Sequence, residues 1–254
     1  MKKSAYIGPK MSRYQFEGLQ NKGWIIEYAT EVYRRRPNIV ARLELDLDNR
    51  FRDVVVKCFG WREARGPFLS PFTKSKAEHV WEMSRRFIDL NIPVPKPVAM
   101  YTERQMGFVN HNVYISEYIG RYQTGDRIVH NEQVPFSKKQ EFVLKVARII
   151  AAVHHAGYLH HDFALDNFLA LDDHSNEVFL IDLTRVENRH RLSLQERVED
   201  FARLGLCDCG LQEDHDDCLW LHFLLRYDAA HAESFIAPLQ KSLQKYQLRG
   251  KSDQ

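Results

Sequence analysis

The chain of 254 residues lacks any run that approaches the ~20 consecutive apolar residues of a membrane-spanning helix. Its first residues include two lysines but no apolar segment after them, so we expect no secretory signal and a cytoplasmic location. Only four cysteines are present, which does not suggest a disulfide framework in a chain of this size. Basic and acidic residues number 36 and 34, so no global attraction to nucleic acid is expected.

The remaining composition is that of an ordinary folded protein, with 44% hydrophobic and 28% charged residues. The first half has strand-like patterns at about 39–46 and 51–59, and the Asp48-Asn49 pair between them is typical of a hairpin turn. A further strand is expected over the segment NVYISEYI. Length and pattern together allow one large domain or two lobes.

A helix is predicted between Ser75 and Asn91. Ser75 and Glu78 form a capping-box pattern at its start, and Asn91 ahead of Ile92-Pro93 is a left-handed stop. The residues expected to face the core at helical spacing are Ala77, Val80, Trp81, Ser84 and Ile88.

The second half has more helical patterns. A capping-box pattern at Ser137 to Gln140 opens a helix that Gly157 should end. Its expected buried face comprises Phe142, Val146, Ile149, Ile150 and Val153. Two short strands are expected near 167–171 and 177–182, followed by helices from about 194 to 247. We therefore expect an α+β protein, with a β-rich part and a helical part that meet near residues 117–126.

Three oxygen-bearing side chains stand out in the second half. Asp162 and Asn167 are five residues apart, and Asp182 ends the apolar segment VFLID. Such side chains could hold a hard cation, and magnesium normally keeps phosphate oxygens among its ligands. The pattern therefore suggests a site for nucleotide phosphates, although an aspartate in a turn and an asparagine in an Asx turn are each common alone.

The motif HHDFALDN followed by IDL resembles the catalytic loop and metal-binding aspartate of the protein-kinase-like fold. More closely, AAVHHAGYLHHDFALDNFLAL and VFLIDLTRV resemble the lipopolysaccharide core kinases, the family of Kdo and heptose kinases. VVVKCF, WEMSRRFIDLNIPVPKPVAM, VEDFARL and LHFLLRYD extend this resemblance over about residues 38–230. It implies a two-lobed fold, with a β-rich N-lobe over 1–118 and a helical C-lobe over 119–254.

The resemblance implies roles for individual residues. Asp162 would accept or orient the proton of the acceptor hydroxyl, and Asn167 and Asp182 would hold Mg²⁺. Lys57 would contact the phosphates of ATP, although an edge-strand lysine that opposes aggregation is the alternative.

Two glutamates four residues apart compete to position Lys57, and both lie on one helical face. We choose Glu82 over Glu78, which closes the capping box. Glu117 is the further residue assigned to nucleotide binding. Packing and loop-holding tasks are expected for His154, His160 and Asp200.

The sequence also departs from the kinase pattern. No glycine occurs from Trp24 to Phe59, so a glycine-rich phosphate loop is missing. His161 replaces the usual arginine and Thr184 the usual glycine, and no Ala-Pro-Glu segment builds a peptide platform. Phosphorylation-dependent switching is therefore not expected, and a saccharide acceptor fits better than a protein.

Arginines follow the metal aspartate in TRVENRHRL. Arg185 and Arg189 could grip an anionic sugar such as Kdo or a phosphorylated inner core, and an exposed basic run is an equal alternative. The family's acceptor is a membrane lipid, which implies peripheral contact with the inner face of the inner membrane.

Cys207, Cys209, His215 and Cys218 form a C-x-C-x5-H-x2-C pattern. Zinc would accept these ligands, but its structural sites usually use C-x2-4-C spacing, so ordinary thiols in a helical connection are the favoured interpretation.

Three hypotheses follow. The first is an ATP- and Mg²⁺-dependent kinase of lipopolysaccharide core sugars. The second is a catalytically silent kinase-like nucleotide-binding module, and the third is a compact protein Ser/Thr kinase. The sequence does not identify the acceptor sugar, its hydroxyl or the oligomeric state.

Overall fold

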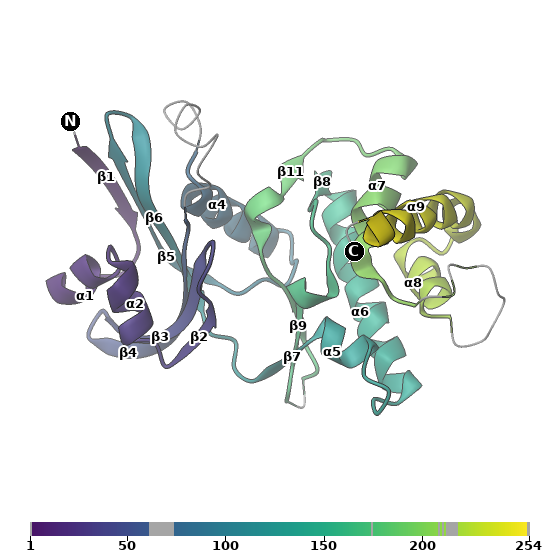
Figure 1. The fold of residues 1–254 in the computed structure, drawn as a ribbon, viewed down its shortest axis with the longest axis horizontal. Helices are drawn as coiled ribbons and strands as arrows, with labels where there is room; N and C mark the ends of the chain where they lie inside the picture. The colour runs from purple at the N-terminus through teal and green to yellow at the C-terminus, as the bar shows by residue number, and fades with distance from the viewer. Residues whose placement is uncertain are drawn as a thin grey trace. The chain divides into compact units, whose positions relative to one another are not determined.

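The computed structural model describes residues 2–60, 74–173, 175–207, 209, 211 and 218–252. The chain divides into two compact units (Figure 1). Unit 1 comprises Met1–Ile88 and Pro95–Ile119, and unit 2 comprises Asp89–Val94 and Gly120–Gln254. That residues 1–118 form a nucleotide-binding N-lobe and residues 119–254 a catalytic C-lobe stays a prediction.

Unit 1 is built on a six-stranded antiparallel sheet in the order β1-β5-β6-β4-β3-β2. The strands are β1 (Lys2–Ile7), β2 (Glu31–Arg34), β3 (Ile39–Leu47), β4 (Arg50–Cys58), β5 (Pro97–Gln105) and β6 (Phe108–Glu117). Two short helices, α1 (Arg13–Gly18) and α2 (Lys22–Glu27), precede β2, and α4 (Lys76–Asp89) follows β4. β1, β2, β5, α1 and α2 were not anticipated from the sequence.

The β3–β4 hairpin is formed as predicted. Asp48 and Asn49 have φ values of 54° and 61°, the left-handed conformations that a two-residue hairpin turn requires. Alternate residues of β3 from Ile39 to Leu47 are buried, which is the period-2 pattern of a strand with one core face. That face packs with Ile25 of α2 in one hydrophobic cluster. The hairpin therefore fixes the register of β4 and the position of Lys57, which pairs with Val40.

Both predicted ends of α4 are confirmed. The Ser75 N–H donates to Glu78 Oε2 at 2.6 Å, and the Glu78 N–H donates to Ser75 Oγ at 3.1 Å. Asn91 has φ 56°, the left-handed stop. The predicted core face was wrong at Ile88, which is 37% exposed, because Phe87 takes its place. Phe87 continues the three-and-four spacing of the other buried residues, whereas Ile88 lies about 100° further round the helix.

Unit 2 is mainly helical, with α5 (Gly125–Val129), α6 (Phe136–His155), α7 (Leu194–Phe201), α8 (Leu219–Tyr227) and α9 (Ala232–Ser252). It contains a three-stranded sheet of β10 (Val178–Leu180), β9 (Phe168–Leu171) and β7 (Tyr122–Thr124), and a pair of β8 (Tyr158–Leu159) and β11 (Glu187–Asn188). Short 3-10 turns are η1 (Leu165–Asn167), η2 (Leu183–Arg185) and η3 (Ala202–Leu204). Among the helices described, none combines the length and the apolar character needed to cross a membrane.

The predicted buried face of α6 is confirmed, and so is its stop at Gly157, which has φ 79°. The predicted capping box at Ser137 was wrong. The helix begins at Phe136 with Pro135 as its N-cap, so Ser137 lies inside the first turn. Proline has no side-chain oxygen to accept a hydrogen bond, and no side-chain cap is formed.

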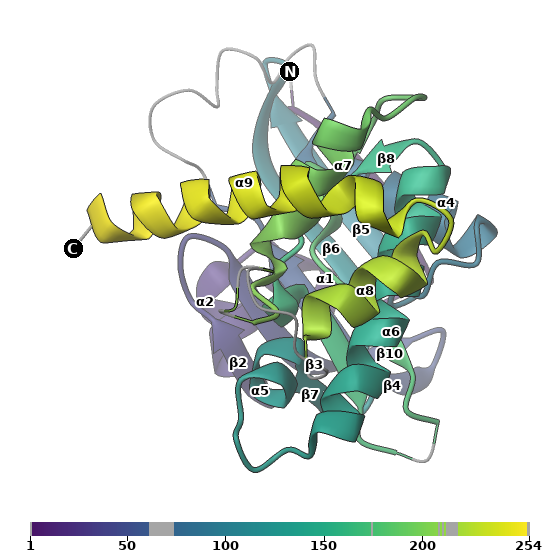
Figure 2. The same ribbon diagram turned by 90° about the vertical axis from the view of Figure 1, so that its right-hand side faces the viewer.

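Aromatic side chains form the centre of unit 2. Phe201 at the end of α7 contacts the rings of Trp220, Phe223 and Tyr227 on α8 and of Phe235 on α9, at centroid distances between 5.1 and 6.4 Å. Figure 2 shows α9 crossing beside α7 and α8, and the three helices are in contact. This core anchors the end of α7, which carries Asp200.

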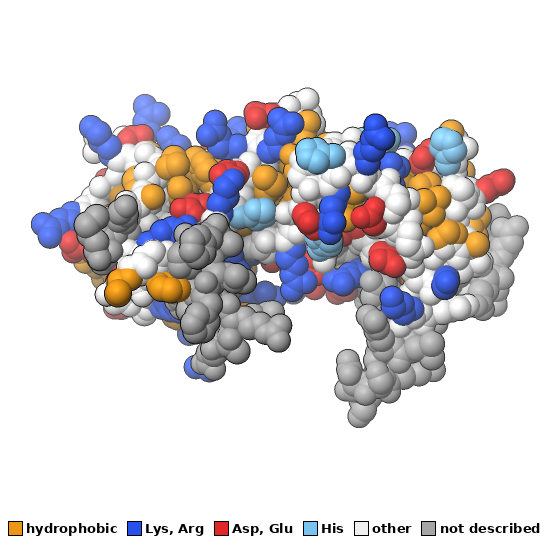
Figure 3. All heavy atoms as spheres, turned by 90° about the horizontal axis from the view of Figure 1, so that it is seen from above, with side chains coloured by type: hydrophobic (Ala, Val, Ile, Leu, Met, Phe, Trp, Pro, Cys, Tyr) orange, Lys and Arg blue, Asp and Glu red, His pale blue; other side chains and the backbone are white. Residues whose placement is uncertain are grey.

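Charges of both signs are present on one face of the molecule. In the view of Figure 3, Asp and Glu side chains are interspersed among the Lys and Arg side chains. A large basic face for nucleic acid is not seen on this side of the molecule.

Candidate functional site

The loop that follows β8 is held by one buried carboxylate. Asp200 Oδ2 accepts the N–H of His160 at 2.8 Å, and Oδ1 accepts the N–H of His161 at 2.6 Å. The Asp200 side chain is 2% exposed. Since Asp162 is the next residue, Asp200 fixes the backbone that presents it. The predicted loop-holding task of Asp200 is confirmed.

Asp200 itself is held by His154 from α6. His154 Nε2 lies 3.1 Å from Asp200 Oδ2, and its Nδ1 lies 2.7 Å from the Tyr227 hydroxyl on α8. Burial lowers the pKa of His154, so the ring is neutral, donating to Asp200 and accepting from Tyr227. Burial alone would raise the pKa of Asp200, but the hydrogen bonds from His154 and the loop N–H groups outweigh it and leave that pKa below its ordinary value.

The buried histidine makes the stability of unit 2 depend on pH. The pKa of His154 is lower in the folded chain than its ordinary 6.5, so only the unfolded chain takes up a proton as the pH first falls below 6.5. The contribution of His154 to the free energy of unfolding is therefore largest above pH 6.5. Below that pH it decreases by up to about 1.4 kcal/mol per pH unit. His160, whose pKa burial also lowers, adds to the same loss.

We expect His154→Gln to reduce this acid sensitivity. Glutamine keeps an N–H donor for Asp200 but does not titrate. The measurement is the urea unfolding free energy of both proteins at about pH 7.5 and about pH 5.5, on either side of the ordinary histidine value. His155→Gln, on the exposed side of the same helix, is the control. An unchanged pH slope in His154→Gln would contradict the assignment.

Asp162 and Asn167 are brought together as predicted. Asn167 Nδ2 donates to the backbone oxygen of Asp162 at 2.8 Å, which leaves the amide oxygen of Asn167 for another partner. The Asp162 side chain is 34% exposed, and Oδ1 faces two cations, with Arg185 at 3.7 Å and Arg203 at 3.8 Å. Arg203 also donates to the His161 backbone oxygen at 3.0 Å. The sequence reasoning missed Arg203, although it lies three residues after Asp200.

Asp182 reaches the same region through strand pairing. β9 and β10 are antiparallel with Phe168 opposite Leu180, and the Ile181 N–H donates to the Asn167 backbone oxygen at 2.9 Å. Asp182 follows with φ 60°, a left-handed conformation that turns the chain into η2. The Thr184 hydroxyl donates to Asp182 Oδ1 at 2.6 Å. Thr184 thus does more than replace a glycine, because it orients the carboxylate.

The donor set fits a hard divalent cation. Asp162, Asn167 and Asp182 offer two carboxylates and one amide oxygen, the ligand type that Mg²⁺ prefers. Both carboxylates also act electrostatically on the buried ring of His160. That ring stacks on Phe163 at 4.6 Å between centroids and is fully buried, so His160 packs the loop as predicted.

His161 and the arginines have local partners. His161 Nε2 lies 2.9 Å from Glu187 Oε2, and Arg189 Nε lies 3.1 Å from Glu187 Oε1. The hydrogen bond from His161 is the main cause of the lowered pKa of Glu187. Arg185 turns to Asp162, so the two arginines predicted to grip an anion do not share one partner.

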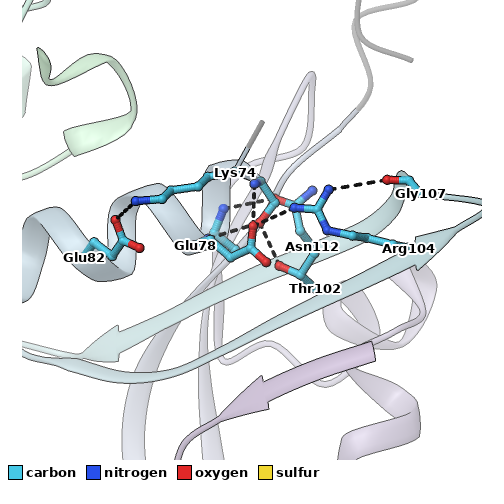
Figure 4. A network of polar contacts seen from close by, with 9 residues as sticks. Lys74, Glu78, Glu82, Thr102, Arg104, Gly107 and Asn112 are labelled. Carbon is cyan, nitrogen blue, oxygen red and sulfur yellow. Dashed lines mark hydrogen bonds and ion pairs between the residues drawn. The ribbon is translucent and has the colours of Figure 1, made fainter. Parts of the chain in front are cut away.

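The residues predicted for nucleotide binding belong to unit 1. Lys57 lies on β4, with Nζ 5.5 Å from the centre of the Phe59 ring. Glu82 on α4 pairs with Lys74 at 2.5 Å, while Glu78 pairs with Arg104 of β5 at 2.7 Å (Figure 4). Glu117 is the last residue of β6, and its N–H donates to the Lys96 backbone oxygen at 2.9 Å.

The contacts in Figure 4 distinguish the two glutamates. The labelled side chains of Thr102, Arg104 and Asn112 surround the start of α4 near Glu78. Asn112 Oδ1 accepts the Ala77 N–H at 3.1 Å, and Ser75 Oγ lies 2.7 Å from Thr102 Oγ1. Glu78 is therefore occupied in attaching α4 to the sheet, whereas Glu82 is in an exposed pair.

A cavity in unit 2 has a volume of about 340 Å³. It lies between α6 and the β9–β10 hairpin, with Lys138, Lys145 and Asp172 among its lining residues. Asp162, Asn167 and Asp182 are not part of its lining, so it is separate from the candidate site.

Comparison with solved structures gives the class of protein. A structure described as WaaP in complex with acyl carrier protein matches with a TM-score of 0.59 and 20% sequence identity, covering 94% of this chain and 99% of that one. This likeness shows a protein-kinase-like fold, which confirms the predicted fold class.

The sequence gives the family. The model of the lipopolysaccharide kinase (Kdo/WaaP) family matches residues 60–207, more than half of the chain. The chain therefore belongs to the lipopolysaccharide kinase (Kdo/WaaP) family, which confirms the predicted resemblance and supports a phosphotransferase that uses ATP. A search of curated proteins gave no match.

Proposed function

We propose that the protein transfers the γ-phosphate of ATP to a sugar hydroxyl, on Kdo or heptose, of the lipopolysaccharide inner core. The observation that carries this proposal is the Asp162 loop, whose backbone is fixed by Asp200 and whose neighbour Asn167 is bonded to it. A hydrogen-bonded backbone with a carboxylate that is about one third exposed suits proton transfer, because catalysis depends on positioning.

In the proposed reaction Asp162 accepts or orients the proton of the sugar hydroxyl. The hydroxyl oxygen forms a bond to the γ-phosphorus, the bond from that phosphorus to the bridging oxygen breaks, and ADP leaves with the bonding pair. Mg²⁺, held by Asn167 and Asp182, would neutralise phosphate charge. Arg185 and Arg203 place further positive charge beside Asp162.

We assign Lys57, Glu82 and Glu117 to nucleotide binding. Lys57 would neutralise phosphate charge, and Glu82 would position it. The Glu82–Lys74 pair is exposed on both sides, at 44% and 62%, and such pairs contribute only ~0–1 kcal/mol. Glu82 could therefore leave Lys74 and pair with Lys57 at little cost in free energy.

For the acceptor we propose an anionic core sugar. Arg185 and Arg189 are about half exposed, and guanidinium groups bind carboxylate or phosphate in a bidentate way. If the acceptor is lipid-linked, the protein would work in the cytoplasm against the inner face of the inner membrane.

The deciding experiment incubates the full chain with labelled ATP, Mg²⁺ and defined core oligosaccharides that contain Kdo or heptose. We expect a product heavier by one phosphoryl group. Nucleotide binding without turnover on any of these sugars would support the silent binding module instead. Phosphorylation of a peptide library but not of the sugars would support a protein kinase.

Replacing Thr184 tests the assignment of Asp182 to the metal. Thr184→Val removes the hydroxyl that donates to Asp182, whereas Thr184→Ser keeps it. Residues that orient a metal ligand typically affect metal affinity or activity by ~10–100-fold. We expect Thr184→Val to raise the Mg²⁺ concentration needed for half-maximal activity and Thr184→Ser to leave it near the wild-type value. Equal Mg²⁺ dependence in both variants would contradict this assignment.

Binding of a protein partner can be tested with the same purified protein. The similar WaaP structure contains acyl carrier protein. We therefore propose measuring whether purified acyl carrier protein binds the full chain and co-elutes with it.

A further inference from the structure

Three of the four cysteines meet at one point in unit 2. Cys207 follows η3, Cys209 lies two residues further on, and Cys218 is the N-cap of α8. Their sulfur atoms are 3.0 Å (Cys207–Cys209), 3.5 Å (Cys209–Cys218) and 4.0 Å (Cys207–Cys218) apart. The fourth cysteine, Cys58, lies on β4 in unit 1 and serves as an isolated reference thiol.

The sulfur triangle has the size of one face of a zinc–thiolate tetrahedron. The Zn–S bond is ~2.3 Å, so an ideal tetrahedron has S···S edges of about 3.8 Å. The circle through the three observed sulfur positions has a radius of about 2.1 Å, so an ion ~2.3 Å from all three would lie about 1 Å out of their plane. An ideal tetrahedron places it about 0.8 Å out of the plane. Only small side-chain shifts are needed.

The surroundings favour a bound ion over idle thiols. Cys218 is fully buried, and Cys207 and Cys209 are partly buried. Thiols are weak hydrogen-bond partners, so three converging sulfurs gain little from one another. Even the shortest sulfur–sulfur distance, 3.0 Å, exceeds the ~2.05 Å of a disulfide. Thiolates are typical ligands of Cu(I), zinc and iron–sulfur clusters, and zinc is the divalent ion of these that prefers a tetrahedral site.

We propose that Cys207, Cys209 and Cys218 bind one Zn²⁺ ion, which goes beyond the proposed kinase function. Each thiol releases its proton to solvent when the ion binds, and one coordination position remains for a further ligand. His215 lies outside the described residues, and the three cysteines alone make up the proposed site. On the sequence alone, the C-x-C spacing argues against a zinc site. In the structure, Cys218 lies nine residues after Cys209 and supplies the third sulfur of the triangle.

The expected role follows from what the ion would join. It would connect the chain just after η3, seven residues beyond Asp200, to the start of α8, which carries Tyr227. Tyr227 contacts His154, and His154 contacts Asp200. The ion would thus stabilise the part of unit 2 from which the Asp162 loop is held.

The test measures metal directly in the full-length protein purified without chelators under reducing conditions. We expect about one zinc per chain by elemental analysis, since one site is proposed. After zinc removal, Co²⁺ should give thiolate-to-cobalt charge-transfer bands and the intense visible bands of a tetrahedral site. Cys209→Ser should abolish the charge-transfer bands or strongly weaken them, and Cys58→Ala, the control outside the cluster, should keep them. Chelation should lower Tm in wild type but not in Cys209→Ser.

Several results would overturn the site. They are the absence of both zinc and the Co²⁺ bands in wild type with reduced thiols, a disulfide among these cysteines in the freshly purified protein, and unchanged bands in Cys209→Ser. If Cys209→Ser does not fold, the wild-type zinc content and Co²⁺ spectrum decide the question alone. Because these readouts do not involve turnover, they are independent of the kinase assay.

Discussion

Asp162→Asn is expected to lower kcat for sugar phosphorylation by about 10²–10⁴-fold, the usual contribution of a general base. The amide has the size of the carboxylate but cannot accept the hydroxyl proton. Since the backbone at this position is fixed by Asp200, the loop should keep its conformation. The measurement is steady-state kinetics with ATP and a core oligosaccharide, together with ATP affinity in the absence of acceptor.

Asp166→Asn is the matched control. Asp166 lies in the same loop, four residues further on, but it is exposed and belongs to η1. The substitution makes the same change from carboxylate to amide, but at a residue without a proposed catalytic role. We therefore expect kcat to remain close to the wild-type value. Equal losses in the two variants, or full activity in Asp162→Asn, would remove Asp162 from the catalytic role.

Asp200→Ala is expected to reduce the unfolding free energy by several times RT, at least about 1–3 kcal/mol, because it removes the acceptor of several buried donors. The substitution leaves the N–H groups of His160 and His161 and the Nε2 of His154 without their acceptor. Each such buried donor costs roughly 1–3 kcal/mol, although these costs are not additive. The measurement is chemical denaturation followed by circular dichroism.

Glu199→Ala provides the comparison on the same helix. The Glu199 carboxylate accepts from Gln195 Nε2 at 2.8 Å at an exposed position. Surface substitutions of this kind usually stay within ±0.5 kcal/mol. A loss in Asp200→Ala no larger than this would show that the loop is not held by Asp200.

Most local patterns were reliable in the sequence analysis, and the exception is the capping box predicted at Ser137 to Gln140. The Asp48-Asn49 turn, the Ser75–Glu78 capping box and the stops at Asn91 and Gly157 depend on residues next to one another, and all are formed. The Asp162, Asn167 and Asp182 motif could also be found, because its spacing is set by one loop and one strand pair. The catalytic and metal-binding roles of these three residues stay predictions.

Long-range partners could not be predicted. Nothing local to Arg203 indicates that it faces Asp162, and the pairing of β1 with β5 joins segments about a hundred residues apart. Ser137 failed as a cap because Pro135 starts the helix earlier. Which face of α4 is buried likewise depended on the sheet that it meets, so Ile88 and Phe87 were exchanged.

Strand β1 has a practical consequence for handling the protein. Lys2 to Ile7 pair residue by residue with Gln105 to Met100, so β1 covers one side of β5. Removing these six residues would make β5 an exposed edge strand with unpaired amide and carbonyl groups. The same strand carries Met100 and Tyr101, which are buried. Such an edge can template pairing with another chain, so a shortened version of this protein is expected to aggregate.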